Sequence, residues 1–64
     1  MHFYLVAPTI RAHSQGFFTY QSENDLAIGS VVMVEIGKRE SVGVVIKKVS
    51  SPDFKTKDII KLIE

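Results

Sequence analysis

The chain has 64 residues, of which 45% are hydrophobic, and its formal net charge is +1 at pH 7. A chain this short buries only about 60% of its unfolded surface, so we expect one domain with one small core over residues 1–64. The absence of cysteine excludes disulfides and thiolate metal sites and favours the reducing cytoplasm. The net charge is too small to indicate nucleic-acid binding by bulk electrostatics, so any electrostatic site must be local.

The first half of the chain predicts two strands joined by a loop. Residues 2–7 form an apolar run rich in β-branched and aromatic side chains, which ends at Pro8. This run is too short for a secretory segment or a membrane span, so we expect a cytoplasmic protein that does not contact a membrane. Residues 9–16 are polar and end in glycine, as loops do, and residues 17–22 (FFTYQS) predict the second strand.

The second half predicts two clear strands and one uncertain one. Residues 31–36 alternate between two faces, and residues 41–51 (SVGVVIKKVSS) repeat the pattern. Gly43 inside that second run indicates a bulge, a bend or a close backbone approach. Residues 51–58 are polar and contain proline, so they predict a loop. Residues 58–64 (DIIKLIE) fit either a short strand or a helical turn, and their all-β neighbours favour the strand.

Five or six short strands at this spacing predict an all-β fold, a small curled β-barrel of the OB-like kind. Closure of such a barrel removes the unpaired edges that an open meander would expose to other chains. Function must then reside in the loops and on one face of the barrel.

Catalytic and metal sites are not indicated. Neither His2 nor His13 has a partner at the spacing of a metal site or a catalytic triad. The segment Gly37-Lys38-Arg39 lacks the upstream glycine and the hydroxyl of a phosphate-binding loop. We therefore expect a domain that is not an enzyme and holds no cofactor.

The polar piece GKRES between two valine-rich runs allows two interpretations. Gly37 supplies an unusual backbone angle in a hairpin and its cationic neighbours keep the tip solvated, or the same cations meet an anion. Seven of the eight cations lie after Gly37, whereas the aromatic residues lie mainly in the first half. A barrel that brings an aromatic strand beside a basic turn offers a base-stacking surface flanked by cations. Strand alternation puts Phe18 and Tyr20 on one face, with Phe17 and Thr19 on the other, and leaves open which pair is core.

The order of short motifs resembles a known family. The motifs are VAP at 6–8, FTY at 18–20, LAIGSVVMV at 26–34, IGKR at 36–39 and VGVVI at 42–46. In this order and spacing the chain resembles the N-terminal 3′-end DNA-binding domain of the primosomal replication-restart helicases (primosomal protein N′, PriA). Family members usually carry Pro-Phe where this chain has Glu35-Ile36.

The resemblance implies a function, a site and partners. The function is capture of the 3′ end of the leading strand at stalled or branched replication forks, with recognition of DNA structure and not of sequence. The implied DNA-binding residues are Phe18, Thr19, Tyr20, Gly37 and Lys61, with Lys38 and Arg39 meeting the terminal phosphates. The other cations of the second half, among them Lys55 and Lys57, are expected to matter less.

The resemblance also implies what would surround the domain. The parent protein would be an ATP-dependent 3′–5′ DNA helicase, with ATP, magnesium and zinc confined to the helicase portion. Further partners would be the remaining helicase domains, primosome proteins and single-strand binding protein. The alternative from the residues alone is an SH3-like interaction barrel that binds extended peptides through exposed aromatic side chains.

Overall fold

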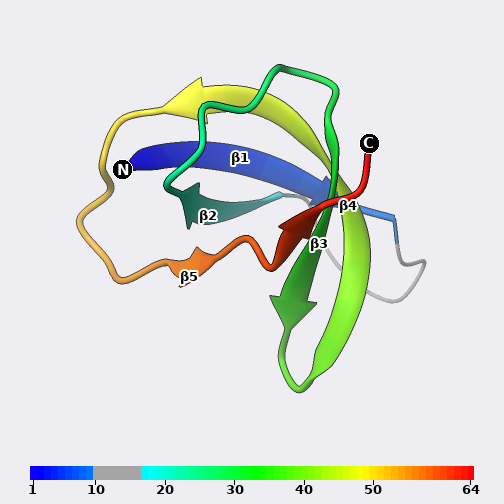
Figure 1. Ribbon diagram of the computed structural model, residues 1–64. Helices are drawn as coiled ribbons and strands as arrows, with labels where there is room; N and C mark the ends of the chain where they lie inside the picture. The colour runs from blue at the N-terminus through cyan, green and yellow to red at the C-terminus, as the bar shows by residue number, and fades with distance from the viewer. Residues whose placement is uncertain (10–16) are drawn as a thin grey trace.

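A computed structural model describes residues 1–9 and 17–64 of the chain. Within these residues the secondary structure consists of strands joined by turns and loops, and no helix that could span a membrane is present among them. The strands form one strongly curled sheet, as Figure 1 shows. The expected small all-β, barrel-like fold is therefore confirmed. Most of the predicted loop at residues 9–16, including His13, lies outside the described residues.

The described part of the chain contains six strands in the sheet order β5-β2-β1-β4-β3-β6. Their bounds are β1 (His2–Pro8), β2 (Phe18–Ser22), β3 (Val31–Ile36), β4 (Arg39–Val49), β5 (Lys57–Asp58) and β6 (Lys61–Leu62). All neighbours pair antiparallel except β2 and β5. Alternation and β-branched content thus located the four long strands to within two residues.

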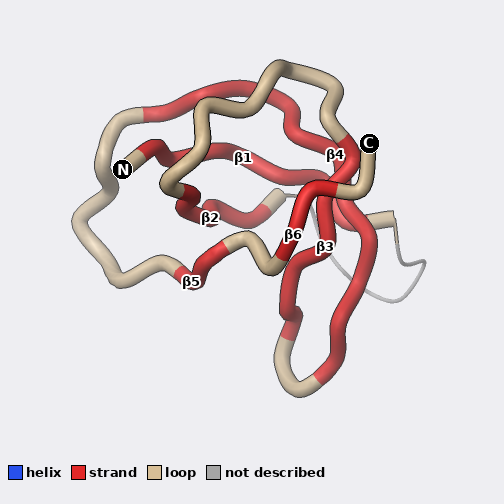
Figure 2. Tube along the Cα trace, viewed as in Figure 1, coloured by secondary structure: helices blue, strands red, loops and turns tan. Residues whose placement is uncertain are grey.

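The C-terminal run differs from the single strand that we expected. It forms two separate two-residue strands, β5 and β6, which lie at opposite ends of the sheet order although they are close in sequence. Between them, the Ile59 N–H donates to the Gln21 carbonyl and the Ile60 N–H donates to the Met33 carbonyl, both at 2.8 Å. One short segment therefore bridges β2 to β3 and closes the curled sheet, as the trace in Figure 2 shows. We call residues 57–62 the closing segment.

The core lies inside the curl. Among the described residues, the buried hydrophobic side chains are Tyr4, Val6, Tyr20, Val32, Val34 and Val45. Leu26, Ile36 and Ile59 pack against them. The predicted shared face of Val32, Val34 and Ile36 is the inward one, because period-2 alternation places those side chains on the same side of β3. Two tyrosines in so small a core need partners for their hydroxyls.

The Tyr4 hydroxyl finds its partners in the segment before β3. It accepts a hydrogen bond from the Leu26 N–H at 2.7 Å and donates to the Asn24 carbonyl at 3.1 Å. This pairing fixes the connection between β2 and β3 over the open end of the curl.

Gly43 marks the point where β1 and β4 approach most closely. A Cβ built there would lie 2.6 Å from Val6 Cγ1 and 3.2 Å from the Ala7 carbonyl oxygen. The register between the two strands then shifts between Leu5 and Val6, opposite Ile46, which is the extra residue on β4. The glycine therefore marks a close backbone approach, one of the three readings its position in a strand allowed, and the bulge lies three residues later.

The β3–β4 hairpin is joined by Gly37 and Lys38, since Ile36 and Arg39 are paired. Gly37 has φ of 62°, whereas Lys38 has no positive φ, which is the pattern of a type II′ turn with glycine in its first central position. Gly37 thus supplies the unusual backbone angle that the sequence predicted. Arg39 belongs to the strand and not to the turn, so β4 begins two residues earlier than expected.

Candidate functional site

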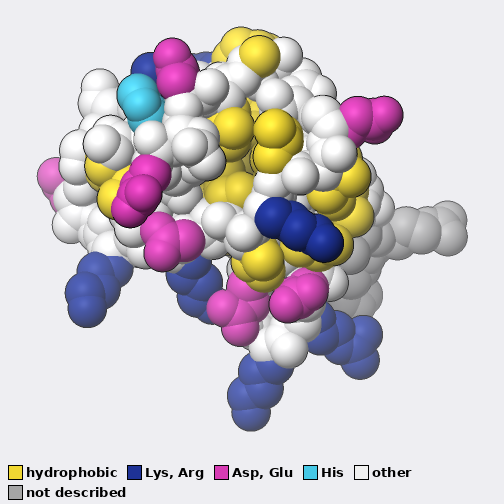
Figure 3. All heavy atoms as spheres, in the orientation of Figure 1, with side chains coloured by type: hydrophobic (Ala, Val, Ile, Leu, Met, Phe, Trp, Pro, Cys, Tyr) yellow, Lys and Arg dark blue, Asp and Glu magenta, His cyan; other side chains and the backbone are white. Residues whose placement is uncertain are grey.

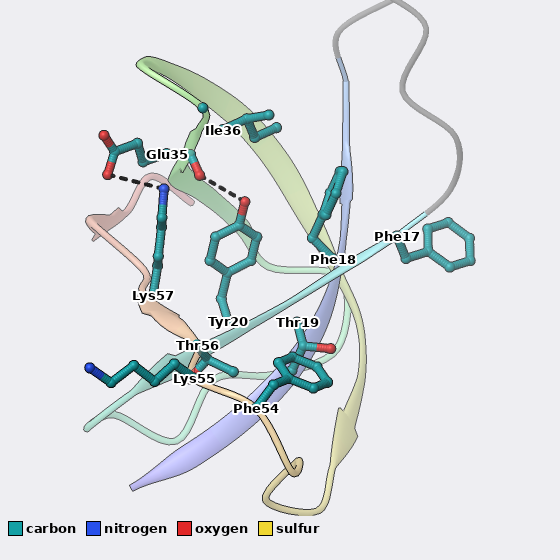
Figure 4. A pocket seen from close by; sticks show the side chains of 11 residues that line it. Phe17, Phe18, Thr19, Tyr20, Glu35, Ile36, Phe54, Lys55, Thr56 and Lys57 are labelled. Atoms are coloured by element: carbon teal, nitrogen blue, oxygen red, sulfur yellow. Dashed lines mark hydrogen bonds and ion pairs between the residues drawn. The ribbon is translucent and has the colours of Figure 1, made fainter.

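A surface cavity of about 360 Å³ lies between β2, the end of β3 and the loop that precedes the closing segment. This volume is near the lower end of the range for small-ligand sites. It is lined by Phe17, Phe18, Thr19, Tyr20, Glu35, Ile36, Gly37, Phe54, Lys55, Thr56 and Lys57. Figure 4 shows these side chains, and we call the space they enclose the aromatic cavity.

The β2 strand supplies the aromatic wall of this cavity. Phe18 and Tyr20 extend to the same side of the strand, and Thr19 extends to the other, as alternation predicted (Figure 4). Tyr20 is 4% exposed and belongs to the core, whereas Phe18 is 39% exposed and stands at the rim. Phe17 is 55% exposed and points away from the other side chains. The cavity therefore combines a fixed aromatic floor with a more exposed aromatic edge.

The hydroxyl of Tyr20 ties this floor to the hairpin. It donates a hydrogen bond to the Glu35 backbone carbonyl at 2.9 Å, as the dashed line in Figure 4 shows. Burial and the nearby Glu35 carboxylate raise the pKa of Tyr20 above its usual value of 10.0. The phenol consequently stays protonated and keeps donating at neutral pH, which holds the end of β3 and the adjacent Gly37 against β2.

The charged wall of the cavity carries two lysines and one carboxylate. Lys57 Nζ lies 3.8 Å from Glu35 Oε1, and both side chains are about half exposed, at 55% and 49%. Within the described residues Lys55 takes part in no ion pair. Two cations and one anion leave this wall with a net charge of +1, so it attracts a phosphodiester.

The structure brings together four of the predicted site residues and separates the other three. Phe18, Thr19, Tyr20 and Gly37 all line the aromatic cavity. Lys38 and Arg39 are exposed at the hairpin tip just beyond Gly37, outside the lining. Lys61 lies on β6 beside Met33 and does not line the cavity either. The cations beside the aromatic wall are Lys55 and Lys57, which we expected to matter less.

Sequence reasoning missed the contribution of the loop before the closing segment. Phe54, Lys55 and Thr56 lie in a stretch read only as a polar loop, and its path across the mouth of the cavity depends on where β5 pairs. One signal was available, because Phe54 is a large apolar residue inside an otherwise polar loop. Such residues either pack under the loop or remain exposed at a binding surface, and Phe54 is 61% exposed.

A second cavity, of about 690 Å³, adjoins the first. It is lined by Ser22, Glu23, Asn24, Glu35, Thr56, Lys57, Asp58, Ile59 and Ile60. Its three carboxylates face a single lysine, so it repels a phosphodiester that the aromatic cavity attracts. The Glu35–Lys57 pair lines both cavities and therefore marks the border between them.

The distribution of charge over the surface agrees with this division. Figure 3 shows acidic side chains on the viewed face, while Lys and Arg side chains project mostly along the lower edge. The hairpin tip, which carries Lys38 and Arg39, points to that edge in Figure 1. An anionic polymer is thus directed to the hairpin side of the molecule.

Comparison with known proteins identifies the family of this domain. No curated protein and no solved structure matches the chain. A family model described as "3′DNA-binding domain (3′BD)", that of PriA, matches residues 6–64. This match covers nearly the whole chain, including all strands that form the aromatic cavity. The chain therefore belongs to the family of PriA 3′ DNA-binding domains.

Proposed function

We propose that this domain captures the free 3′ end of the leading strand at stalled or branched replication forks, and that it recognises DNA structure and not base sequence. The observation that carries this proposal is the convergence of Phe18, Tyr20 and Gly37 on one cavity beside two lysines, in a chain of the 3′ DNA-binding family. The domain would act in the cytoplasm, as the DNA-binding part of an ATP-dependent 3′–5′ helicase.

In this proposal the aromatic cavity takes the terminal nucleotide. Phe18 at the rim stacks on the terminal base, since every base offers a π-face and stacking is tolerant of sequence. Gly37 lacks a Cβ and allows the sugar to approach the backbone closely. Thr19 and Tyr20 form the floor beneath it. A volume of about 360 Å³ suits one nucleotide unit and not a continuing strand.

Cations at two distances would hold the backbone that leads into the cavity. Lys55 and Lys57 lie at the cavity itself and meet the phosphate of the last nucleotides. Lys38 and Arg39 at the hairpin tip meet phosphates further along the DNA, and Lys61 contributes from β6 outside the cavity. Such contacts position the nucleic acid and carry no sequence information. The remaining helicase domains, primosome proteins and single-strand binding protein would engage other surfaces.

The test is binding of short fluorescent single strands that differ only at their ends, measured by anisotropy at fixed ionic strength. One strand has a free 3′-hydroxyl, the second a neutral 3′-O-methyl group, and the third the same methyl group at the 5′ end. We expect the 3′-methyl group to weaken binding and the 5′-methyl group to have no effect, because only the 3′ terminus enters the cavity. Equal affinity for all three strands would refute end capture.

A pair of variants tests the placement of the terminal base. Phe18→Ala should weaken binding of the free 3′ end, since base–aromatic stacking contributes about 1–3 kcal/mol per base. Phe17→Ala is the matched control, because Phe17 is an adjacent exposed phenylalanine whose side chain points away from the cavity. Unfolding of the domain by Phe18→Ala would show that Phe18 is core and that this placement is wrong.

A further inference from the structure

We infer that Glu35 determines which chemical form of the 3′ end the domain accepts, favouring a 3′-hydroxyl over a 3′-phosphate by charge repulsion. This inference rests on the proposed function and assigns it one specificity-determining residue. Glu35 lies where other family members usually carry proline, so the carboxylate is a feature of this chain.

The position of Glu35 gives it this role. Among the described residues it is the one carboxylate that lines the aromatic cavity. Its backbone carbonyl is held by the Tyr20 hydroxyl at 2.9 Å, and its carboxylate lies 3.8 Å from Lys57 Nζ. The backbone is thus fixed by the core while the side chain faces the border of the cavity. A change in the carboxylate leaves the hydrogen bond to Tyr20 in place, because that bond uses the main chain.

Charge arithmetic shows what the carboxylate changes. Without Glu35 the cavity wall would carry only Lys55 and Lys57, a site with two cations that favours a terminus bearing an extra phosphate. A terminal phosphate adds a charge of about −1.5 to −2 near neutral pH, whereas a hydroxyl adds none. Glu35 opposes that added charge and occupies Lys57 through their ion pair. A 3′-hydroxyl meets no such repulsion and can donate a hydrogen bond to a carboxylate.

The experiment separates the charge of the terminal group from its bulk. Anisotropy titrations compare strands that end in a 3′-hydroxyl, a neutral 3′-O-methyl group and a 3′-phosphate, with the unchanged chain and with Glu35→Gln. The glutamine keeps the size of the side chain and removes its charge. We expect Glu35→Gln to strengthen binding of the 3′-phosphate strand about three- to tenfold relative to the 3′-hydroxyl strand at low salt.

Glu40→Gln is the matched control. Glu40 is the Cα partner of Glu35 across the hairpin, is exposed and lies outside the lining of the aromatic cavity. This variant changes the net charge of the hairpin equally, so a general electrostatic effect on DNA binding appears in both variants. We expect the ratio of 3′-phosphate to 3′-hydroxyl affinity to change with Glu35→Gln and to stay constant with Glu40→Gln.

The outcomes distinguish this inference from the function on which it rests. Equal binding of the 3′-hydroxyl and 3′-O-methyl strands overturns end capture, and the inference with it. Rejection of the methyl group, with the phosphate ratio unchanged by Glu35→Gln or changed equally by Glu40→Gln, overturns the inference alone. Added salt provides a third check, because the advantage gained by Glu35→Gln should shrink as the Debye length falls from about 10 Å at 0.1 M to about 3 Å at 1 M. An advantage that persists unchanged at high salt contradicts charge repulsion.

Discussion

Replacement of Gly43 by alanine tests how tightly β1 and β4 are packed. The new Cβ would lie 2.6 Å from Val6 Cγ1, whereas an ordinary carbon–carbon contact is about 3.5–4.0 Å. The two atoms must therefore separate by about 1 Å. Val6 is fully buried and β-branched, so its side chain has little freedom to turn away, and the Ala7 carbonyl blocks the Cβ at 3.2 Å from a second direction.

Two opposing effects set the magnitude. Overpacking of a core costs about 1–3 kcal/mol, while replacing glycine restricts the unfolded chain and returns about 0.4–1 kcal/mol. We expect Gly43→Ala to lower the free energy of unfolding by about 1–2 kcal/mol. A domain of 64 residues has only about 3–10 kcal/mol of stability, so the loss is large in proportion.

Urea unfolding followed by circular dichroism measures this change, and a double-mutant cycle tests its cause. Val6→Ala removes the methyl group that the new Cβ meets, so the two substitutions should couple by about 1 kcal/mol or more, with Val6→Ala less harmful beside Ala at position 43. Additivity within about 0.3–0.5 kcal/mol would refute the assigned contact. Stability equal to that of the unchanged chain would show that the strands can move apart at no cost.

Three further predictions concern the hairpin, the floor of the cavity and the closing segment. Joint replacement of Lys38 and Arg39 by alanine should reduce the slope of log affinity against log salt by about 1, and an unchanged slope would show that the turn is only a turn. Tyr20→Phe should lower the free energy of unfolding by about 1 kcal/mol in thermal or urea melts, since the bond to the Glu35 carbonyl is lost. Because the folded-state pKa of Tyr20 is raised, its contribution is complete below about pH 10 and falls as pH rises further, a decline that Tyr20→Phe should lessen and an identical decline would contradict. Deletion of residues 57–64 should abolish cooperative unfolding and cause aggregation, seen by light scattering, because it uncovers the edges of two strands.

The sequence predicted those parts of the fold that carry their own period. Residues 31–36 alternate so regularly that both the strand and its inward face could be named in advance. The closing segment could not be predicted in the same way. Two-residue strands have no period, and the switch of pairing from β2 to β3 between Asp58 and Lys61 depends on how the whole sheet curls.

The candidate site divides along the same line. Phe18, Tyr20 and Gly37 were identifiable because a short motif and a turn-forming glycine mark their positions locally. Lys55 and Lys57 were not, because a cation in a loop reveals its position only when the loop's path is known. Exposed aromatic side chains alone also left the SH3-like alternative open, and the family match decides between the two.

The closing segment also has a consequence for the order of events during folding. It pairs with residues 21 and 33 but is among the last parts of the chain to be synthesised, so the sheet stays open until those residues have emerged from the ribosome. Contacts over such sequence separations form late, after the β3–β4 hairpin has brought its neighbours together. Substitutions such as Ile59→Ala should therefore accelerate unfolding and leave the folding rate nearly unchanged. The lifetime of the native domain, more than the speed of its formation, is set by its last few residues.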